Sequence, residues 1–312
     1  MTLNILFSAR PNFWKKYEAP LPRALAEAGI DARVFQPGEV AAEDVDYIVF
    51  APNGPVEDFA PFVKAKAALS LWAGVESVVG NETLQMPLAR MVDTSLTEGM
   101  VEWVTGQVLR HHLGLDRHIV NPENDWKFVI PPLARDRVVT VLGLGALGMA
   151  CAEALVALNF RVRGWSRSAK EVAGVESFSG EDGLLAAVEG AEIVVLLLPD
   201  TPATENVMDA RAFAAMPEGG FVINPGRGPL VDDAALLAAL DSGQLAHATL
   251  DVFRQEPLPE GHAFWAHPKV TVTAHTASET RPWSASQAVA ANILRAEAGE
   301  ALVGLVDRGA GY

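Results

Sequence analysis

The sequence has few of the features that mark specialised classes of protein. It contains one cysteine, Cys151, in 312 residues, so no disulfide can form within the chain and a reducing compartment is expected. It has 24 lysines and arginines against 39 acidic residues, and no basic cluster is longer than a few residues. The formal net charge of −15 therefore argues against nucleic acid or an anionic membrane as a partner.

Targeting and membrane signals are also missing. The N-terminal segment MTLNILFSAR has neither a basic start nor a cleavage pattern, so no signal peptide is expected. Residues 138–152 are uncharged, but their glycines and the adjacent Glu153 make them too short for a bilayer span. No group of His, Cys, Asp and Glu has metal-ligand spacing, so no metal is expected. We expect a globular cytoplasmic protein, whose 50% hydrophobic residues suffice for a packed core.

Residues 138–148 read VVTVLGLGALG, an apolar run that breaks into three glycines before a helical pattern. Gly143 permits a tight turn, and Gly145 lets the backbone approach phosphate groups. Gly148 lets the helix pack closely against its strand. The N-terminus of that helix would direct main-chain N–H groups at an anion. The pattern predicts a dinucleotide site, and the alternative is a buried strand–turn–helix that binds nothing.

Strands and helices alternate along most of the chain. Besides the run before the glycines, the expected strands are residues 3–8, 47–51, 67–72, 161–165, 193–198, 220–224, 248–252 and 270–273. The expected helices are residues 21–28, 99–113, 232–242 and 285–299, with an irregular proline-rich arm over 117–136. The alternation predicts an α/β protein. We expect a Rossmann-type doubly wound parallel sheet, residues 96–278, inserted in a smaller flavodoxin-like substrate domain, residues 1–95 and 279–312.

The end of the second strand of that sheet bears on the choice of cofactor. A site for NAD usually has a carboxylate there, which holds the adenosine 2′-hydroxyl and would repel a 2′-phosphate. Here the strand ends in GWSRS, followed by Lys170, with no acid at the expected place. A hydroxyl and two cations would bind a 2′-phosphate by charge-assisted hydrogen bonds, and Arg167 could also stack on adenine. We therefore expect NADP(H) rather than NAD(H), unless Arg167 and Lys170 are only solvated surface cations.

Three later strands end in the polar segments NPGRG, DVFRQEP and TAHTAS. The carboxyl ends of parallel strands converge on one crevice, so Arg227, Glu256 and His275 can meet there. Each has an ordinary alternative explanation. His275 could be a hydrogen-bonded structural residue, Arg227 could pair with Asp232, and Glu256 could cap a local turn.

This trio, with the glycine turn upstream, closely resembles the D-2-hydroxyacid dehydrogenase family over nearly the whole chain. The WSRS after the second strand, the TRP after His275 and the C-terminal VDRGAGY resemble more narrowly its glyoxylate/hydroxypyruvate reductases of type A. The resemblance implies reduction of small anionic 2-oxo acids with NADPH, glyoxylate to glycolate and hydroxypyruvate to D-glycerate, by a homodimer. Two residues depart from the common pattern. Ala274 stands where a proline often precedes the histidine, and Ser166 replaces the usual acid.

The chemistry suits these residue types. His275 would donate a proton to the carbonyl oxygen, and a Glu256 carboxylate beside it would favour the imidazolium and fix its orientation. The Arg227 guanidinium would hold the substrate carboxylate and polarise the keto oxygen. By resemblance, Asp251 would orient the nicotinamide carboxamide. Main-chain N–H groups of the turn at 73–75 would bind the substrate carboxylate as the domains close and exclude water.

The expected contacts form two sets. Cofactor contacts are expected from Gly143, Gly145, Ala146, Leu147, Gly148, Trp165, Ser166, Arg167, Ser168, Lys170, Leu198, Pro199, Thr204, Pro225, Gly226, Arg227, Asp251 and His275. Substrate contacts are expected from Trp72, Ala73, Gly74, Val75, Arg227, His275 and Arg281, although Arg281 could instead form a surface ion pair. Trp126, in the proline-rich arm, is expected to be a dimer contact. His111 and His112 end a helix whose dipole would stabilise a partial positive charge on them.

Two other functions remain open from the sequence. The first is an enzyme of the same fold that acts on phosphite, formate or a bulkier 2-oxo acid. The second is a binding protein that senses NAD(P)H without turnover. Such a sensor would need a partner-binding groove or extension, and the sequence indicates neither a tail nor a linker.

Overall fold

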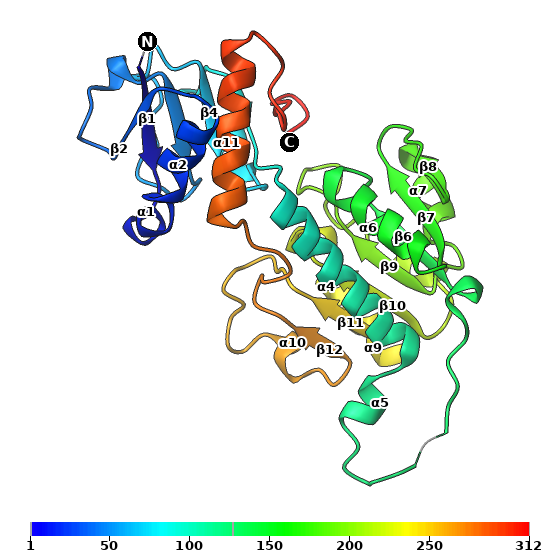
Figure 1. The fold of residues 1–312 in the computed structure, drawn as a ribbon. Coiled ribbons are helices and arrows are strands. Elements are labelled where there is room, and N and C mark those ends of the chain that lie inside the picture. The colour runs from blue at the N-terminus through cyan, green and yellow to red at the C-terminus, as the bar shows by residue number, and fades with distance from the viewer. Residues whose placement is uncertain (1, 127, 312) are drawn as a thin grey trace. The chain divides into compact units, whose positions relative to one another are not determined.

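Two separate parallel sheets organise the chain, each in its own compact unit (Figure 1). The computed structural model describes residues 2–126 and 128–311. One unit comprises Met1–Leu96 with Glu279–Tyr312, and the other comprises Thr97–Ser278. Lys127 of the proline-rich arm and Tyr312 of the VDRGAGY segment lie outside the described residues.

The first unit has a five-stranded sheet in the order β2-β1-β3-β4-β5. Its strands are β1 (Leu3–Ser8), β2 (Ala32–Phe35), β3 (Tyr47–Phe50), β4 (Ala67–Ser70) and β5 (Leu88–Ala89). Its helices are α1 (Pro11–Tyr17), α2 (Pro20–Glu27), α3 (Glu76–Val79) and α11 (Pro282–Glu297), with a short 3₁₀ turn at Ala42–Asp44. All neighbouring strands pair in parallel, and the order 2-1-3-4-5 is that of flavodoxin-like folds, as the sequence predicts.

Alternation of side chains along β1 gives the first unit a core on each face of its sheet. Ile5 and Phe7 pack with Leu21 of α2 and Ile293 of α11, whereas Leu6 packs on the other face. Figure 1 shows α11 beside α2 on the first of these faces, although they lie at opposite ends of the sequence. The C-terminal helix is therefore part of the first unit.

The second unit has a seven-stranded parallel sheet in the order β12-β11-β10-β9-β6-β7-β8. Its strands are β6 (Val138–Leu142), β7 (Arg161–Ser166), β8 (Val175–Ser179), β9 (Ile193–Leu196), β10 (Gly220–Asn224), β11 (Leu245–Leu250) and β12 (Val270–Val272). Its helices are α4 (Thr94–Leu113), which begins just before the unit boundary, α5 (Asp116–Ile119), α6 (Ala146–Ala157), α7 (Gly180–Val188), α8 (Ala210–Ala215), α9 (Asp233–Ser242) and α10 (Ala263–Ala266), with 3₁₀ turns at Ala134–Asp136 and Gly228–Leu230.

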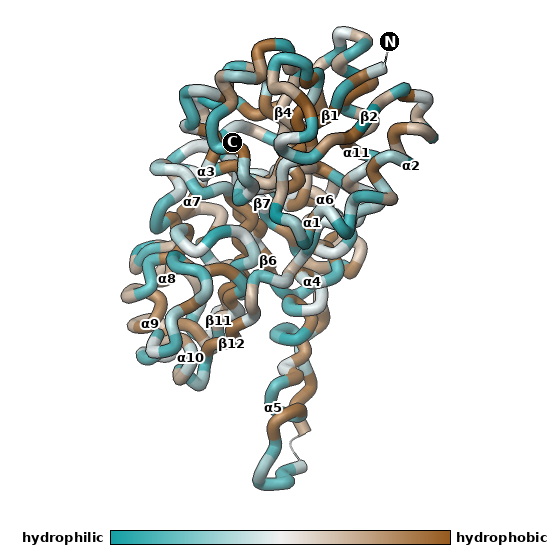
Figure 2. Tube along the Cα trace, turned by 90° about the vertical axis from the view of Figure 1, so that its left-hand side faces the viewer, coloured by the Kyte–Doolittle hydropathy of each residue, from teal (hydrophilic) through white to brown (hydrophobic). Residues whose placement is uncertain are grey.

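The strand order of the second unit reverses between β6 and β9, the two strands at its centre. This order confirms the predicted Rossmann-type doubly wound sheet, in which ligands bind beyond the carboxyl ends of the strands at the reversal. Helices α4 and α6 cover one face, and α7, α8 and α9 cover the other. Strand β9 is buried on both faces and reads IVVL, as expected for a central strand of a parallel sheet. Figure 2 colours each residue of the chain by its hydropathy, with hydrophobic residues in brown.

Several element ends differ from the sequence predictions. Strand β11 begins at Leu245 rather than at 248, because the left-handed Gly243 ends α9 and Leu245 already pairs with Gly220. The strand also ends at Leu250 rather than at 252, so Asp251 follows the strand instead of lying within it. Helix α4 begins five residues before the predicted 99, where the Asp93 carboxylate accepts a hydrogen bond from the N–H of Leu96 at 3.3 Å.

Other differences have equally local causes. Strand β4 stops at Ser70 rather than at 72, because the Ser70 hydroxyl bonds the main-chain N–H and C=O of Trp72 and turns the chain. Helix α11 starts at Pro282 rather than at 285, since proline suits the first turn of a helix. Strand β8 was not predicted, because its sequence, VESFS, is polar and it forms one edge of the sheet. Among the described residues, no helix has the length and apolar character needed to cross a bilayer.

Candidate active site

The glycine turn lies between β6 and α6, beside the reversal of the strand order. Gly143 has φ +108°, and a Cβ there would lie 2.4 Å from the Leu197 carbonyl oxygen. A Cβ on Gly148 would lie 1.7 Å from the carbonyl oxygen of Gly143. A Cβ on Gly145 would meet nothing within 4 Å, although Gly145 caps the N-terminus of α6. Two glycines are thus required by the fold, and the third leaves open space where a pyrophosphate would lie.

The last residues of β7 are buried, whereas those that follow the strand are exposed. The Trp165 indole is buried in the core and donates from Nε1 to the Gly180 carbonyl oxygen at 2.8 Å. The buried Ser166 hydroxyl donates to the Ser168 carbonyl oxygen at 2.7 Å. Arg167 and Lys170 are exposed at the end of the strand. Any cofactor contact from Trp165 is therefore limited to its main chain, whereas both cations reach solvent.

Hydrogen bonds within the loop after β9 stabilise its conformation. Thr204 is buried, and its hydroxyl donates to the Pro199 carbonyl oxygen at 2.7 Å and accepts from the Thr201 N–H at 2.9 Å. Leu198 is also buried. Thr204 is one of the expected cofactor contacts, but its hydroxyl is already hydrogen-bonded within the loop.

Arg227 is fixed in the turn after β10 by an amide that sequence reasoning missed. The buried Asn224 side chain accepts from the Gly226 N–H at 3.1 Å and donates to the Arg227 carbonyl oxygen at 2.9 Å. The Arg227 guanidinium donates to the Gly226 carbonyl oxygen at 2.7 Å. The signal for Asn224 was its position as a polar residue at the end of an apolar strand. Asp232, the alternative partner of Arg227, instead caps α9 by accepting from the Ala235 N–H at 3.0 Å.

Asp251 holds the segment that carries His275. It is fully buried, and its Oδ1 accepts from the Thr273 hydroxyl at 2.5 Å and from the Thr276 N–H at 2.9 Å. Its Oδ2 accepts from the Ala277 N–H at 2.9 Å. A carboxylate offers about four acceptor positions, so roughly one remains on Oδ2. The expected contact with a carboxamide would use that position.

His275 and Glu256 are in direct contact. The ring Nδ1 of His275 lies 2.7 Å from Oε2 of Glu256, and Oε1 of Glu256 accepts from the Phe253 N–H at 2.9 Å. An ionised carboxylate only accepts, so Nδ1 is the donor. No described residue bonds Nε2 of His275, whose side chain is 50% exposed. His275 has φ +54°, a strained conformation typical of functional positions.

The Arg227 turn meets the Glu256 segment through the backbone. A Cβ on Gly228 would lie 1.9 Å from the carbonyl carbon of Phe253 and 2.3 Å from the Arg254 nitrogen. Glu256 and His275 therefore form a hydrogen-bonded pair, and Arg227 is carried by a turn that abuts the same segment. All three follow the carboxyl ends of neighbouring strands in the second unit.

The expected substrate contacts of the first unit lie after β4. Trp72 is partly buried against the core, and its carbonyl oxygen accepts from the Met91 N–H at 2.9 Å. Within the described chain, the main-chain N–H groups of Ala73, Gly74 and Val75 have no protein acceptor. Arg281 is exposed at the start of α11, and no described acid pairs with it. The segment thus offers free donors to an anion.

The expected positive charge on His111 and His112 is wrong. His111 is a buried residue in the last turn of α4. Its ring stacks on the Phe221 ring with 4.7 Å between the centroids, and its Nε2 lies 2.9 Å from the Thr249 hydroxyl oxygen. Burial lowers the pKa of His111 to about 3 and also lowers the pKa of His112. The last turn of α4 packs against the sheet, so loss of solvent outweighs the helix dipole.

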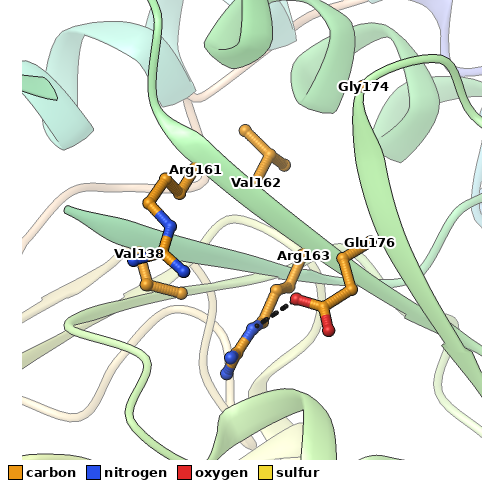
Figure 3. A pocket seen from close by; sticks show the side chains of 6 residues that line it. All are labelled: Val138, Arg161, Val162, Arg163, Gly174 and Glu176. Atoms are coloured by element: carbon orange, nitrogen blue, oxygen red, sulfur yellow. Dashed lines mark hydrogen bonds and ion pairs between the residues drawn. The ribbon is translucent and has the colours of Figure 1, made fainter. Parts of the chain in front are cut away.

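Other candidate features lie away from this site. A cavity of about 220 Å³ opens at the amino ends of β6, β7 and β8, the opposite edge of the sheet (Figure 3). There Arg163 pairs with Glu176 at 3.0 Å. Cys151 is buried in α6, and burial raises the pKa of its thiol to about 12, which excludes it as a nucleophile. Within residues 2–126 and 128–311, no group of His, Cys, Asp and Glu could hold a metal ion.

Comparison with protein families gives one matching model. Residues 106–277 match the model described as D-isomer specific 2-hydroxyacid dehydrogenase, NAD binding domain. The chain is 38% identical to a glyoxylate/hydroxypyruvate reductase A from Serratia proteamaculans, over 99% of this chain and 100% of the relative. It is 37% identical to the protein of the same name from Yersinia enterocolitica, with the same coverage of 99% and 100%.

Solved structures are similar over the whole chain. A D-isomer specific 2-hydroxyacid dehydrogenase from Xanthobacter autotrophicus, in complex with NADPH and MES, has a TM-score of 0.92 and 39% identity, with 100% of both chains covered. An NADPH-dependent glyoxylate/hydroxypyruvate reductase from Sinorhizobium meliloti, in complex with NADP and sulfate, has a TM-score of 0.85 and 34% identity, with 99% of this chain and 100% of that chain covered.

Proposed function

Since the chain belongs to the D-isomer specific 2-hydroxyacid dehydrogenase family, we propose that it reduces small 2-oxo acids with NADPH. The preferred substrates are glyoxylate, which gives glycolate, and hydroxypyruvate, which gives D-glycerate. Relatives named for these substrates match the full chain, and a similar solved structure is described as NADPH-dependent. The hydrogen-bonded pair of His275 and Glu256 is the single observation that carries the chemical part of the proposal.

The chain offers a fitting place for the cofactor. The open space over Gly145 and the N-terminus of α6 would receive the pyrophosphate. Arg167, Ser168 and Lys170 would hold the 2′-phosphate, since no carboxylate ends β7. When bound, NADPH supplies the hydride that adds to the carbonyl carbon. The turns after β9, β10 and β11 would line its nicotinamide end, where Asp251 has one acceptor position to offer.

His275 supplies the proton that the reduction needs. Its Nδ1–H donates to Glu256, which leaves Nε2 directed away from that partner. In the imidazolium form Nε2–H donates to the carbonyl oxygen and transfers its proton as the carbon accepts hydride, so that a 2-hydroxy acid and a neutral imidazole result. The Glu256 carboxylate stabilises the imidazolium and holds the ring in one orientation. The Arg227 guanidinium binds the substrate carboxylate and the keto oxygen.

The first unit supplies further anion-binding groups in this proposal. The main-chain N–H groups of Ala73, Gly74 and Val75 would donate to the substrate carboxylate, because they have no acceptor among the described residues. Arg281 would add a cation, and Trp72 would limit the size of the substrate. A small acid such as glyoxylate then satisfies the donors without requiring a large pocket.

Steady-state kinetics with a panel of 2-oxo acids tests the function directly. We expect turnover of glyoxylate and hydroxypyruvate, measured by NADPH absorbance, with pyruvate and branched or aromatic acids as poorer substrates. Activity confined to branched or aromatic acids, or oxidation of phosphite or formate with reduction of NAD(P)+, would assign the chain to another enzyme of this fold. Tight binding of NADPH with no turnover of any acid would support a sensing protein instead.

We also propose that the enzyme is a cytoplasmic homodimer. The end of α5 and the arm after it expose a series of large apolar side chains, namely Ile119, Val120, Trp126, Phe128, Val129, Ile130 and Leu133. Such a stretch on a soluble enzyme is typical of a subunit interface. The single buried cysteine supports a reducing compartment.

A further inference from the structure

The arginine within DVFRQEP has no role in the reaction proposed above. Arg254 lies two residues before Glu256, and its side chain is 34% exposed. Its guanidinium nevertheless makes five contacts with two other segments of the second unit. These are Nη1 to Glu205 Oε1 at 3.4 Å, Nη2 to the Asn206 side-chain oxygen, Nη2 to the Pro229 carbonyl oxygen at 3.3 Å, Nη2 to the Val231 carbonyl oxygen at 2.7 Å, and Nε to Asp233 Oδ1 at 3.8 Å.

One of these segments, residues 229–233, follows Arg227 and Gly228 directly in the chain. Gly228 lies so close to the backbone of Phe253 and Arg254 that it has no room for a Cβ. The Arg254 side chain then reaches across this junction to the carbonyl groups of Pro229 and Val231. The turn that carries Arg227 and the turn that carries Glu256 are therefore joined by backbone packing and by one guanidinium.

The other segment, residues 205–206, belongs to the loop after β9. Asn206 lies two residues beyond Thr204, and its N–H donates to the Pro229 carbonyl oxygen at 2.8 Å. Arg254 binds its side-chain oxygen and also pairs with Glu205. Loops that follow three neighbouring strands, β9, β10 and β11, thus meet at Arg254.

Arg254 also lies inside the turn that fixes Glu256. The Phe253 N–H donates to Glu256 Oε1, and Glu256 Oε2 accepts from His275. A shift of Arg254 would move this N–H donor, and the carboxylate would follow. The position of the histidine ring depends on that carboxylate, because it is the ring's one described side-chain partner.

We propose that Arg254 is a positioning residue that anchors the 253–256 turn on the loops after β9 and β10. It thereby holds Glu256 in contact with His275, and it keeps the turn that carries Arg227 in a fixed position relative to this pair. The inference rests on the proposed function for its catalytic meaning. The planar guanidinium is essential to it, since one side chain must donate to several acceptors that lie in different fixed directions. A lysine offers a point charge and would replace only part of the contacts.

Kinetics of Arg254→Met and Arg254→Lys test the role. With glyoxylate we expect kcat of Arg254→Met to fall by about 10–100-fold, as a small misplacement of reacting groups does, with NADPH affinity within about twofold of wild type. Arg254→Lys should recover part of the loss. Arg163→Met is the matched control, because Arg163 is also a partly buried arginine that bonds a glutamate and a carbonyl group, at the opposite edge of the sheet. It should keep wild-type kcat.

Nuclear magnetic resonance of labelled histidines gives a readout that needs no substrate. The Nδ1–H proton of His275, assigned by its loss in His275→Gln, should weaken or vanish in Arg254→Met and persist in Arg163→Met. An Arg254→Met enzyme with wild-type kcat and an unchanged signal would overturn the inference. If Arg254→Met does not fold, the same two results in Arg254→Lys would overturn it. Absence of turnover in the wild-type enzyme would refute the proposed function alone, because the proton signal still tests the positioning role.

Discussion

Nδ1 of His275 lies 2.7 Å from Oε2 of Glu256, across 19 residues of sequence. The main chain supports both partners. The Asp251 carbonyl oxygen accepts from the His275 N–H at 2.8 Å, and the Asp251 carboxylate binds the two N–H groups that follow His275. The Phe253 N–H holds the other oxygen of Glu256. A half-exposed histidine is thus fixed by a fully buried aspartate, which is an arrangement suited to proton transfer to a bound substrate.

Replacing Arg167 by aspartate should change the cofactor preference. A carboxylate after β7 would repel a 2′-phosphate and accept from a 2′-hydroxyl, so the ratio of kcat/KM with NADPH to that with NADH should fall by about tenfold or more. The measurement is steady-state kinetics with each cofactor. Arg161→Asp makes the same charge change at the other end of β7 and should leave the ratio unchanged. A ratio that does not move in Arg167→Asp would place the phosphate contact elsewhere.

Gly145→Val separates cofactor binding from folding. A side chain there meets no protein atom within 4 Å and the backbone needs no positive φ, so the melting temperature should stay near the wild-type value. The side chain would fill the space expected for the pyrophosphate, so the Kd for NADPH should rise by about tenfold or more. Fluorescence titration measures the Kd. Gly106→Val, an open position on α4, is the control and should bind NADPH normally. Equal Kd values in the two variants would contradict this placement of the cofactor.

Acid should destabilise the second unit through two histidines, the buried His111 and the partly buried His247. Burial lowers the pKa of His111 to about 3 and of His247 to about 4, from 6.5. Below pH 6.5 the unfolded chain takes up these protons first, so stability is complete above that pH and is lost as the pH falls towards the folded-state values. Each histidine adds up to about 1.4 kcal/mol per pH unit to the dependence of the free energy of unfolding on pH.

Urea unfolding at several pH values between 7 and 4 checks this slope. His111→Gln retains a neutral partner for the Thr249 hydroxyl but does not titrate, so its free energy of unfolding should depend less on pH. His118→Gln, in the exposed helix α5, should keep the wild-type slope. Identical slopes in all three proteins would show that His111 titrates normally in the folded state.

Trp126 tests the proposed dimer. Its side chain is 92% exposed in the single chain, so Trp126→Ser should leave the folded monomer intact and raise the dissociation constant of a dimer by about tenfold or more, as a central aromatic contact does. Sedimentation velocity over a range of concentrations measures it. Val63→Ser removes an apolar side chain that is also exposed, in the first unit, and should not change assembly. A wild-type protein that sediments as a monomer throughout would refute the dimer.

Much of the fold follows from local pattern. The apolar runs before Gly143 and at β9 belong to a series of strand patterns that alternate with helical patterns, and this alternation predicts a parallel doubly wound sheet. The conformations of Gly143 and Gly148 follow from the same motif, because a strand and a helix can meet so closely only without a Cβ between them.

The contacts that build the site are less accessible to sequence reasoning. Asp251 binds residues 22–26 positions away, and Arg254 binds residues up to 49 positions away, so neither set of partners has a local signal. The burial of His111 depends on the packing of α4 against Phe221, which a helix-dipole argument ignores. Strand β8 escaped prediction because an exposed edge needs no apolar alternation.

The most direct measurement is kcat for glyoxylate reduction with NADPH in His275→Gln, next to the wild-type enzyme and to His267→Gln. We expect kcat to fall by about 10²–10⁴ in the first variant, the usual contribution of a general acid, while NADPH binds as before and His267→Gln turns over normally. Wild-type turnover by His275→Gln would contradict proton donation by this residue, and with it the proposed mechanism.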